Sequence, residues 1–269
     1  MKSIEVVVQG ALGRMGREVI NALCNEPEMQ VVGAVELQVA EEHLTLPDSS
    51  GKVPFSSDLE YILTKCQPEV LVDFTVAQAT MPAVRIATKQ GVNLVIGTTG
   101  LTTDDIGEIE QLTRAHQVGA VVAPNFALGA VLMIHLAKLA GKYLDHAEII
   151  ELHHHQKVDA PSGTALSTAR AMAQARGKPF YRPAESGEIS GSRGEQVEGI
   201  TIHSVRLPGL MAHQEVILGT TGQTLRIRHD TINRQCYMPG VILAIKEVVK
   251  RQGLVYGLDA LLGLRRDDD

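Results

Sequence analysis

The sequence predicts an α/β protein with an N-terminal parallel sheet and a second, α+β domain that contains a mixed or antiparallel sheet. Over the first 125 residues, short β-branched runs alternate with helical segments, which is the pattern of βαβ units. A glycine-rich turn separates the first such run from the first helix. Towards the C-terminus, residues 201–207, 215–219 and 224–229 alternate apolar and polar side chains, with turn residues between them, as antiparallel strands do.

Composition narrows the class of protein. The chain has 269 residues, 44% of them hydrophobic and 21% charged, which is ordinary for a globular protein. A net charge of −6 argues against a nucleic-acid partner, and no apolar run is long enough to cross a membrane. Three widely spaced cysteines, Cys24, Cys66 and Cys236, form no CxxC pair, so we expect reduced thiols and a cytoplasmic location.

The glycine-rich turn predicts a dinucleotide site, and with it a Rossmann-like first domain. Residues 4–9 read as a buried strand and residues 17–25 as a helix. Between them, glycines supply a tight turn and let a pyrophosphate approach the start of the helix. Leu12 stands where the usual middle glycine would be, so a turn of purely structural use remains an alternative. The residues expected to bind the cofactor here are Gly10, Ala11, Leu12, Gly13, Arg14 and Met15.

An acidic residue follows the second strand, residues 29–36. Glu36 lies twenty residues after Gly16, where a carboxylate can accept hydrogen bonds from both hydroxyls of the adenosine ribose. The same negative charge would repel a 2′-phosphate. The alternative is a solvated strand end with no ligand.

Further strands and helices complete the first domain. Residues 38–54 read as a polar loop, residues 58–66, 81–90 and 103–117 as helices, with Pro82 in a first turn, and residues 69–74, 93–96 and 120–123 as strands. In a parallel sheet, ligands bind beyond the carboxyl ends of the strands. Two polar turns lie at such ends and are candidate cofactor contacts, although ordinary turns remain possible: Gly97, Thr98 and Thr99, and then Ala123, Pro124, Asn125 and Phe126.

The alternation breaks at residues 124–129, which places a domain boundary there. Residues 128–144 read as a largely buried helix, and residues 177–199 as a long loop that covers a site or contacts a partner. Arg193, His203, His213 and His229 are possible borders of a substrate site, although roles on a strand surface are favoured.

The stretch from Glu151 to Ala165 holds most of the chemically active residues. It joins a strand, residues 147–152, to a helix, residues 164–176, through a polar turn. Pro161 suits the first turn of that helix, and Asp159 or Ser162 could cap it. The helix start, together with Lys157, suits an anion, and histidines can supply a proton near neutral pH. These features suit binding a carboxylate and protonating the group attached to it.

Two other interpretations of the histidine run remain open. Three consecutive histidines could bind a metal ion. On a strand, however, His153 and His155 point one way and His154 the other, so no metal site is predicted. A solvated polar loop is the second alternative.

The pattern Glu151-x-His153-x-x-x-Lys157-x-Asp159-x-Pro161-Ser-Gly-Thr-Ala165 resembles the signature of the 4-hydroxy-tetrahydrodipicolinate reductase (dihydrodipicolinate reductase) family. The glycine turn and the segments 97–100 and 123–126 also resemble that family, over essentially the whole chain. The resemblance implies NAD(P)H-dependent reduction of 4-hydroxy-tetrahydrodipicolinate, a cyclic dicarboxylate, to tetrahydrodipicolinate in the lysine and diaminopimelate pathway. It also implies that the chain returns to the first domain near its end. The expected domains are therefore residues 1–125 and 235–269 for dinucleotide binding, and residues 126–234 for substrate binding and oligomerisation.

The resemblance implies roles for individual residues. His153 and Lys157 are the expected catalytic residues, and the expected substrate contacts are His154, Lys157, Gly163 and Thr164. The family often has an arginine after the acidic residue of the second strand. Leu37 at that position predicts a preference for NADH, with Arg14 still allowing some NADPH use. The family uses the sheet of the second domain for tetramer assembly, so a homotetramer is expected.

One departure and three rival functions remain. Many family members have His-His-Arg-His-Lys where this chain has His153-His-His-Gln-Lys157, which could change substrate affinity. The rivals are a non-catalytic nicotinamide-dinucleotide sensor, another nicotinamide-dependent oxidoreductase of amino-acid metabolism, and a metal-dependent hydrolase.

Overall fold

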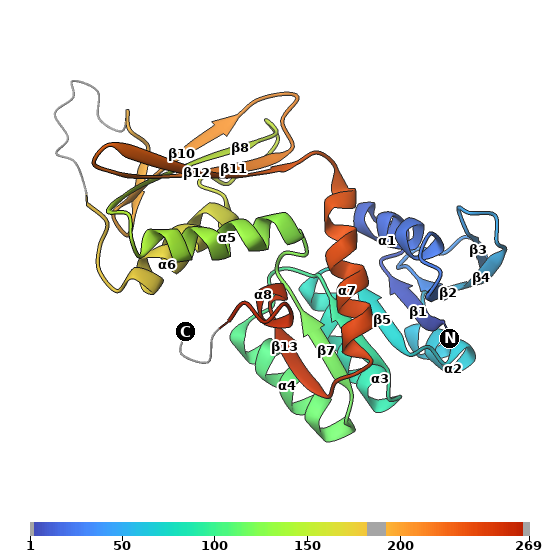
Figure 1. The fold of residues 1–269 in the computed structure, drawn as a ribbon. Helices are drawn as coiled ribbons and strands as arrows, with labels where there is room; N and C mark the ends of the chain where they lie inside the picture. Colours follow the sequence, from blue (N-terminus) through green and yellow to red (C-terminus); the bar gives the residue numbers. More distant parts are fainter. Residues whose placement is uncertain (1–2, 182–191, 266–269) are drawn as a thin grey trace. The chain divides into compact units, whose positions relative to one another are not determined.

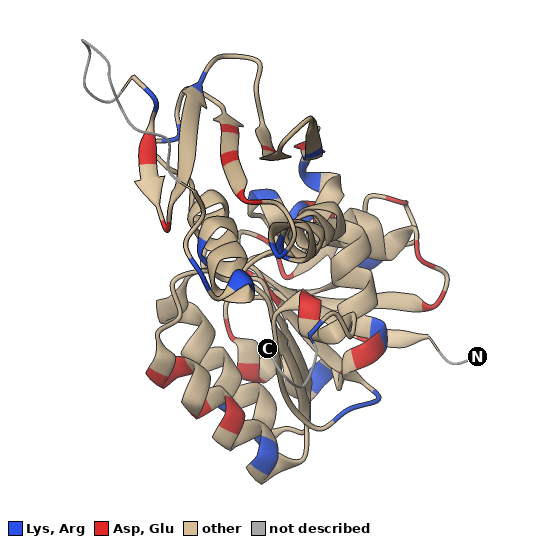
Figure 2. Ribbon diagram, turned by 60° about the vertical axis from the view of Figure 1, so that its left-hand side comes forward, with Lys and Arg blue, Asp and Glu red and all other residues tan. Residues whose placement is uncertain are grey.

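A computed structural model describes residues 3–181 and 192–265 of the chain (Figure 1). The chain divides into two compact units. The first contains the residues up to 128 together with residues 234–264, and the second contains residues 129–233. Within the described residues, no helix combines the length and the apolar character needed to cross a membrane. Figure 2 shows basic and acidic residues interspersed along both units.

The first unit is built on an eight-stranded sheet in the order β13-β7-β6-β5-β1-β2-β4-β3. Every pairing in it is parallel except that of β3 with β4. The strands are β1 (Ile4–Gln9), β2 (Met29–Val35), β3 (His43–Thr45), β4 (Lys52–Ser56), β5 (Val70–Asp73), β6 (Asn93–Ile96), β7 (Gly119–Val122) and β13 (Gly253–Tyr256). The last strand joins β7 although about 130 residues separate them (Figure 1). The α/β class with a parallel-rich first sheet is thus confirmed.

Helices cover both faces of this sheet, as a parallel sheet requires. On one face pack α2 (Leu59–Cys66), α3 (Ala77–Lys89) and α4 (Thr103–His116), and on the other α1 (Arg14–Cys24) and α7 (Met238–Val248). Alternate residues of each strand serve the two faces. In β1, for example, Val7 belongs to the core beneath α2, α3 and α4. A short helix, α8 (Leu258–Leu261), follows β13.

The strand order reverses beside β1. The chain runs from β1 outward through β2 and β4, and then returns to β5 on the other side of β1 before continuing to β6 and β7. Loops that leave the carboxyl ends of β1 and β5 therefore diverge. Such a topological switch point is where doubly wound sheets bind their ligands.

The second unit contains a five-stranded mixed sheet in the order β12-β11-β8-β10-β9. The strands are β8 (His146–His153), β9 (Glu195–Val197), β10 (Ile200–Arg206), β11 (Ala212–Thr220) and β12 (Gln223–Thr231). β10 pairs with β8 in parallel, and the other pairings are antiparallel. Helices α5 (Leu128–Gly141) and α6 (Gly163–Arg176) lie on one face (Figure 1), where they enclose an apolar core with Ile149 and Val216.

Three expectations from the sequence need correction. Residues 38–54 are not only a loop, because β3 lies within them and pairs with β4, which begins within them and ends at Ser56. Helix α3 begins at Ala77 rather than at residue 81, so that Pro82 lies inside the helix. The helix starts early because the chain turns immediately after Asp73, where Thr75 donates its N–H to the Asp73 carboxylate at 3.0 Å. Part of the predicted long loop, residues 182–191, lies outside the described residues, and β9 forms within its end.

Candidate active site

The glycine turn leaves the start of α1 open to an anion. Gly10 has φ +76°, which favours glycine. A Cβ on Gly16 would lie 2.0 Å from the Gly10 carbonyl oxygen, so only glycine allows the helix to approach the strand this closely. Gly13 caps α1 without a side-chain hydrogen bond. The first amides of α1 therefore keep their capacity to donate to a phosphate, and the turn fits a dinucleotide.

Glu36 lies next to this turn and is hydrogen-bonded to it. Its Oε2 accepts from the backbone N–H of Leu12 at 3.0 Å, and its Oε1 accepts from Leu37 N–H at 2.9 Å. A carboxylate has about four acceptor positions. Each oxygen therefore retains a position for a ribose hydroxyl while the turn stays anchored. Leu37 itself is 86% exposed and brings no positive charge.

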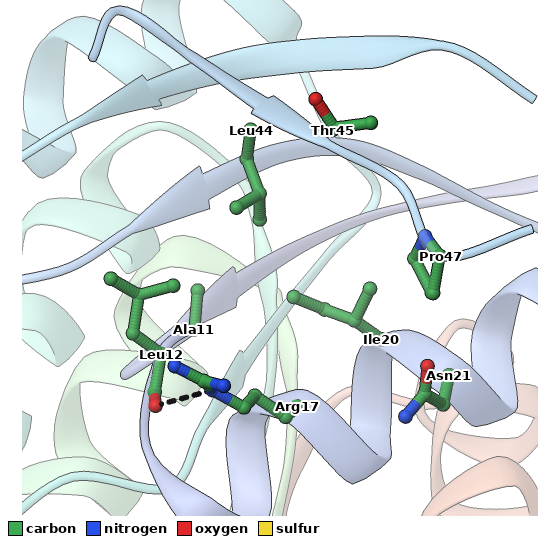
Figure 3. A pocket seen from close by; sticks show the side chains of 8 residues that line it. All are labelled: Ala11, Leu12, Arg17, Ile20, Asn21, Leu44, Thr45 and Pro47. Carbon is green, nitrogen blue, oxygen red and sulfur yellow. Dashed lines mark hydrogen bonds between the residues drawn. The ribbon is translucent and has the colours of Figure 1, made fainter. Parts of the chain in front are cut away.

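A hollow of about 310 Å³ adjoins the same turn, between α1 and the hairpin of β3 and β4 (Figure 3). Arg17 lines it and donates from Nε to the Leu12 carbonyl at 2.9 Å. The other lining residues are Ala11, Leu12, Ile20, Asn21, Leu44, Thr45 and Pro47. The exposed side chain of Arg14 lies on the first turn of α1. Arg17 is thus a second cation at the glycine turn, bound to the same residue, Leu12, as Glu36, and the sequence reasoning did not single it out.

The switch point holds a buried acid that was also not predicted. Asp73 ends β5 and is 1% exposed. Its Oδ1 accepts hydrogen bonds from Thr75 N at 3.0 Å and from Thr75 Oγ1 at 2.6 Å. Burial raises the pKa of Asp73, although the hydrogen bonds from Thr75 and Thr80 oppose that shift. A polar residue at the end of an apolar strand, followed by Thr75, is the signal that could have revealed this turn.

The other expected cofactor residues lie at carboxyl ends of neighbouring strands. Gly97, Thr98 and Thr99 follow β6, and residues 123–126 follow β7. Thr98 is buried, and its hydroxyl accepts from Thr75 N–H at 3.0 Å, so it stabilises the switch-point turn. Phe126 is also buried, with its ring 5.6 Å from that of Phe74. Thr99 and Pro124 are exposed, and Asn125 is half-buried. At these strand ends, exposed residues that a cofactor could contact therefore lie next to buried residues that hold the turns in place.

The polar stretch of the second unit joins the end of β8 to the start of α6. Ser162, rather than Asp159, is the cap of α6, and its Oγ accepts from Ala165 N–H at 3.2 Å. The expectation that Pro161 lies in the first turn is wrong, because the helix begins at Gly163. The amides of Gly163 and Thr164 accordingly lie in that first turn, where an anion is favoured.

Glu151 and His153 point the same way from β8, two residues apart. Glu151 is fully buried. Its Oε2 lies 2.5 Å from His153 Nδ1 and 2.8 Å from Arg206 Nη1, while its Oε1 lies 2.8 Å from Arg206 Nη2 and 3.1 Å from Ser162 N. Burial acts to raise the pKa of Glu151, but hydrogen bonds from His153, Arg206 and Ser204 outweigh it and lower that pKa to about 2. The carboxylate is therefore ionised at neutral pH.

Lys157 lies on the turn beside this cluster. Its Nζ is 2.7 Å from each carboxylate oxygen of Asp159, and that contact lowers the pKa of Asp159. The Lys157 side chain is 22% exposed and that of Asp159 is 61% exposed. Asp159 therefore orients the ammonium group from the solvent side.

The remaining histidines do not gather with His153 around one point. β8 ends at His153, so His154 and His155 lie beyond the strand, and His155 is exposed. Within the described part of the chain, no three His, Cys, Asp or Glu side chains are grouped to hold a metal ion. Arg193 and His203 both pair with Glu148, and His213 Nδ1 lies 2.7 Å from Asp230. Glu148, His203, His213 and Asp230 lie on strands, whereas Arg193 reaches Glu148 from the turn that precedes β9.

Comparison with known proteins gives the family. The family model described as the N-terminus of dihydrodipicolinate reductase matches residues 4–126, and that of its C-terminus matches residues 129–262. The chain belongs to the dihydrodipicolinate reductase family.

Reductases of this family are similar to the chain over nearly the full length of both proteins. A 4-hydroxy-tetrahydrodipicolinate reductase of Dehalococcoides mccartyi is 56% identical over 98% of this chain and 100% of its own. One from Moorella thermoacetica is 49% identical over 97% of this chain and 98% of its own. A dipicolinate-bound dihydrodipicolinate reductase from Paenisporosarcina sp. TG-14 has a TM-score of 0.87 at 39% identity, covering 96% of this chain and 99% of that one. An amine dehydrogenase from Mycobacterium smegmatis (TM-score 0.68, 17% identity) shares the fold alone.

Proposed function

We propose that the chain catalyses the NAD(P)H-dependent reduction of 4-hydroxy-tetrahydrodipicolinate, with loss of water, to tetrahydrodipicolinate in lysine and diaminopimelate biosynthesis. The observation that carries this proposal is the imidazole of His153, held at Nδ1 by the ionised Glu151 and accompanied by Lys157 and a helix start. A dinucleotide sensor would need none of these groups. Membership of a reductase family likewise disfavours the sensor and the metal-dependent hydrolase.

The second unit supplies the groups for substrate. A cyclic dicarboxylate needs partners for two negative charges, and the Gly163 and Thr164 amides at the start of α6 suit one carboxylate. Lys157 suits the other or the charge that develops on the ring, and His154 would contact substrate. His153 acts as general acid and delivers a proton to the ring, which becomes more negative on reduction.

The first unit supplies the groups for the cofactor. When bound, the nicotinamide supplies the hydride. The residues proposed to hold the dinucleotide are Gly10, Ala11, Leu12, Gly13, Arg14, Met15, Glu36, Gly97, Thr98, Thr99, Ala123, Pro124, Asn125 and Phe126. NADH is the proposed preference, because Glu36 offers acceptors for the ribose hydroxyls and the exposed Leu37 offers no charge for a 2′-phosphate. Arg14 and Arg17 would support the remaining use of NADPH.

The proposed assembly is a homotetramer and the proposed location is the cytoplasm. One face of the sheet in the second unit is covered by α5 and α6 (Figure 1). On the opposite face lie apolar side chains that are only partly buried in a single chain, including Ile150, Val205 and Ile217, as expected of a subunit contact. Light scattering after size-exclusion chromatography would test the assembly. The three cysteines form no disulfide in the described structure, as expected of cytoplasmic thiols.

The test is oxidation of NADH and of NADPH, followed by nicotinamide absorbance. The substrate is made freshly from pyruvate and aspartate semialdehyde by the enzyme that catalyses the preceding condensation. Substrate-dependent loss of absorbance is expected, with greater kcat/KM for NADH. A folded protein that binds NADH but oxidises none of it with this substrate would defeat the proposed function.

A further inference from the structure

The geometry points to the Glu151–Arg206 ion pair as the positioning element of the site. We infer that it holds His153 in one tautomer and also fixes the turn of Lys157 and the start of α6. The inference rests on the proposed function for its catalytic meaning, although the arrangement itself can be tested without substrate. Glu151 and Arg206 act through other groups and are not proposed to touch substrate.

The acceptor capacity of Glu151 is fully used. Arg206 Nη2 and Ser162 N donate to Oε1, and Arg206 Nη1 and His153 Nδ1 donate to Oε2, and the Ser204 hydroxyl donates to the same carboxylate. The Glu151 side chain is fully buried. Since a carboxylate offers about four acceptor positions, no position remains for a substrate. Its role is therefore to orient the groups that donate to it.

One of these contacts decides the tautomer of His153. Ionised Glu151 can only accept, so the nitrogen at 2.5 Å from it, Nδ1, must carry a hydrogen. The other nitrogen, Nε2, is then the one that can exchange a proton with substrate. The His153 side chain is 14% exposed, so the ring is partly accessible. A defined tautomer is what a carboxylate partner commonly supplies to a catalytic imidazole.

Arg206 extends the same arrangement to the turn. Its guanidinium faces Glu151 with two parallel hydrogen bonds of 2.8 Å, a geometry that lysine cannot reproduce. Nε also donates to the carbonyl of Lys157 at 3.2 Å, and Nη2 donates to that of Asp159 at 2.6 Å. The pair therefore fixes the backbone on both sides of the Lys157–Asp159 contact.

The third attachment is the start of α6. Ser162 donates its N–H to Glu151 at 3.1 Å and caps the helix with its side chain at the same time. The general acid, the ammonium group and the proposed carboxylate site are thus tied to one ion pair, in which Glu151 is fully buried and the Arg206 side chain is 19% exposed. Buried ion pairs add little to stability over apolar replacements, which favours a role in geometry.

The experiment compares Glu151→Gln and Arg206→Lys with a control, Glu148→Gln. Glu148 lies on the same strand and also pairs with an arginine and a histidine, Arg193 and His203, but outside the site. Nitrogen-15 NMR of wild-type protein without substrate should show His153 protonated at Nδ1, and Glu151→Gln should remove its downfield Nδ1 proton resonance. Circular dichroism and NADH binding, which depends on the first unit, establish folding.

Kinetics give the second readout. Glu151→Gln should lower kcat by about 10²-fold, the scale of a misplaced catalytic group, with a smaller change in substrate KM. Arg206→Lys should lower kcat and also raise substrate KM, because the turn of Lys157 loses its anchor. Glu148→Gln should match wild type. A His153 ring unprotonated at Nδ1 in wild type, or a folded Glu151→Gln protein with wild-type kcat, would overturn the inference. Absence of turnover in wild type with the expected NMR signature would instead count against the proposed function alone.

Discussion

Glu36 accepts a hydrogen bond from the backbone N–H of Leu12 at 3.0 Å, so the acid that ends the second strand also anchors the glycine turn. Arg17 holds the carbonyl of the same residue at 2.9 Å. The acidic group proposed for the ribose and the turn proposed for the pyrophosphate are therefore directly hydrogen-bonded to each other. Changes at Glu36 should affect both cofactor selectivity and cofactor affinity.

Glu36→Gln should lower the ratio of kcat/KM for NADH to that for NADPH by about 10-fold, roughly the worth of one charged hydrogen bond. The amide removes the charge that repels a 2′-phosphate but keeps an oxygen that can accept from Leu12. The measurement is initial-rate kinetics with both cofactors. Glu18→Gln, a neutralisation elsewhere on α1, serves as control. An unchanged ratio would show that Glu36 does not set selectivity.

His153→Gln should lower kcat by roughly 10²–10⁴-fold, which is the usual contribution of general acid catalysis. Glutamine can still donate a hydrogen bond to Glu151 but cannot deliver a proton to the ring of the substrate. The matched control is His203→Gln, because His203 also pairs with a glutamate, Glu148. Near-normal turnover in a folded His153→Gln protein would remove His153 as the acid.

Lys157→Ala should raise substrate KM and lower kcat, because the ammonium group is proposed to bind a carboxylate and the developing charge. Asp159→Asn should have a smaller effect on both constants, since Asp159 only orients Lys157 from the solvent side. Lys178→Ala, a change at an exposed lysine, controls for general loss of positive charge. Unchanged KM and kcat in Lys157→Ala would contradict this role.

Because the pKa of Glu151 is low, the free energy of unfolding should decrease as the pH is lowered. The Glu151 pKa of about 2 lies below the ordinary value of 4.5, so the unfolded state binds the proton first as pH falls. Stability from this group is complete above about pH 5 and is lost as pH falls towards 2. Between pH 6 and 3.5, wild type should lose about 1.5 kcal/mol more free energy of unfolding than Glu151→Gln. Urea unfolding at the two pH values measures this, and equal losses would refute it.

Asp73 should make stability depend on pH in the direction opposite to Glu151. Burial raises the pKa of Asp73, so the folded state binds the proton more tightly and stability falls as pH rises from the unfolded value through the folded one. Asp73→Asn keeps an acceptor for Thr75 and has no charge to bury. Above neutral pH, its melting temperature should equal or exceed that of wild type, whereas Asp73→Ala should melt lower. A large loss of stability in Asp73→Asn would mean that the charge itself is required.

Much of the fold was predictable from local pattern. The mostly apolar runs at residues 4–9 and 93–96 are strands with those same bounds, because a strand buried on both faces is rich in apolar residues. β3, β4, β9 and β13 were missed. They are three to five residues long and are strands only because a neighbouring strand provides hydrogen-bond partners.

The sequence alone determined the chemistry that is available: a glycine turn followed by Glu36, and His153, Lys157 and a helix start within fifteen residues. Residue type and spacing suffice for that, since periodicity and turn preference act locally. Only the tertiary structure decided which groups meet. Arg206 reaches Glu151 from another strand 55 residues away, and Asp73 becomes buried beside the turn of a separate strand. Such contacts depend on strand order and register, which arise from packing of the whole sheet rather than from the residues nearby in the chain.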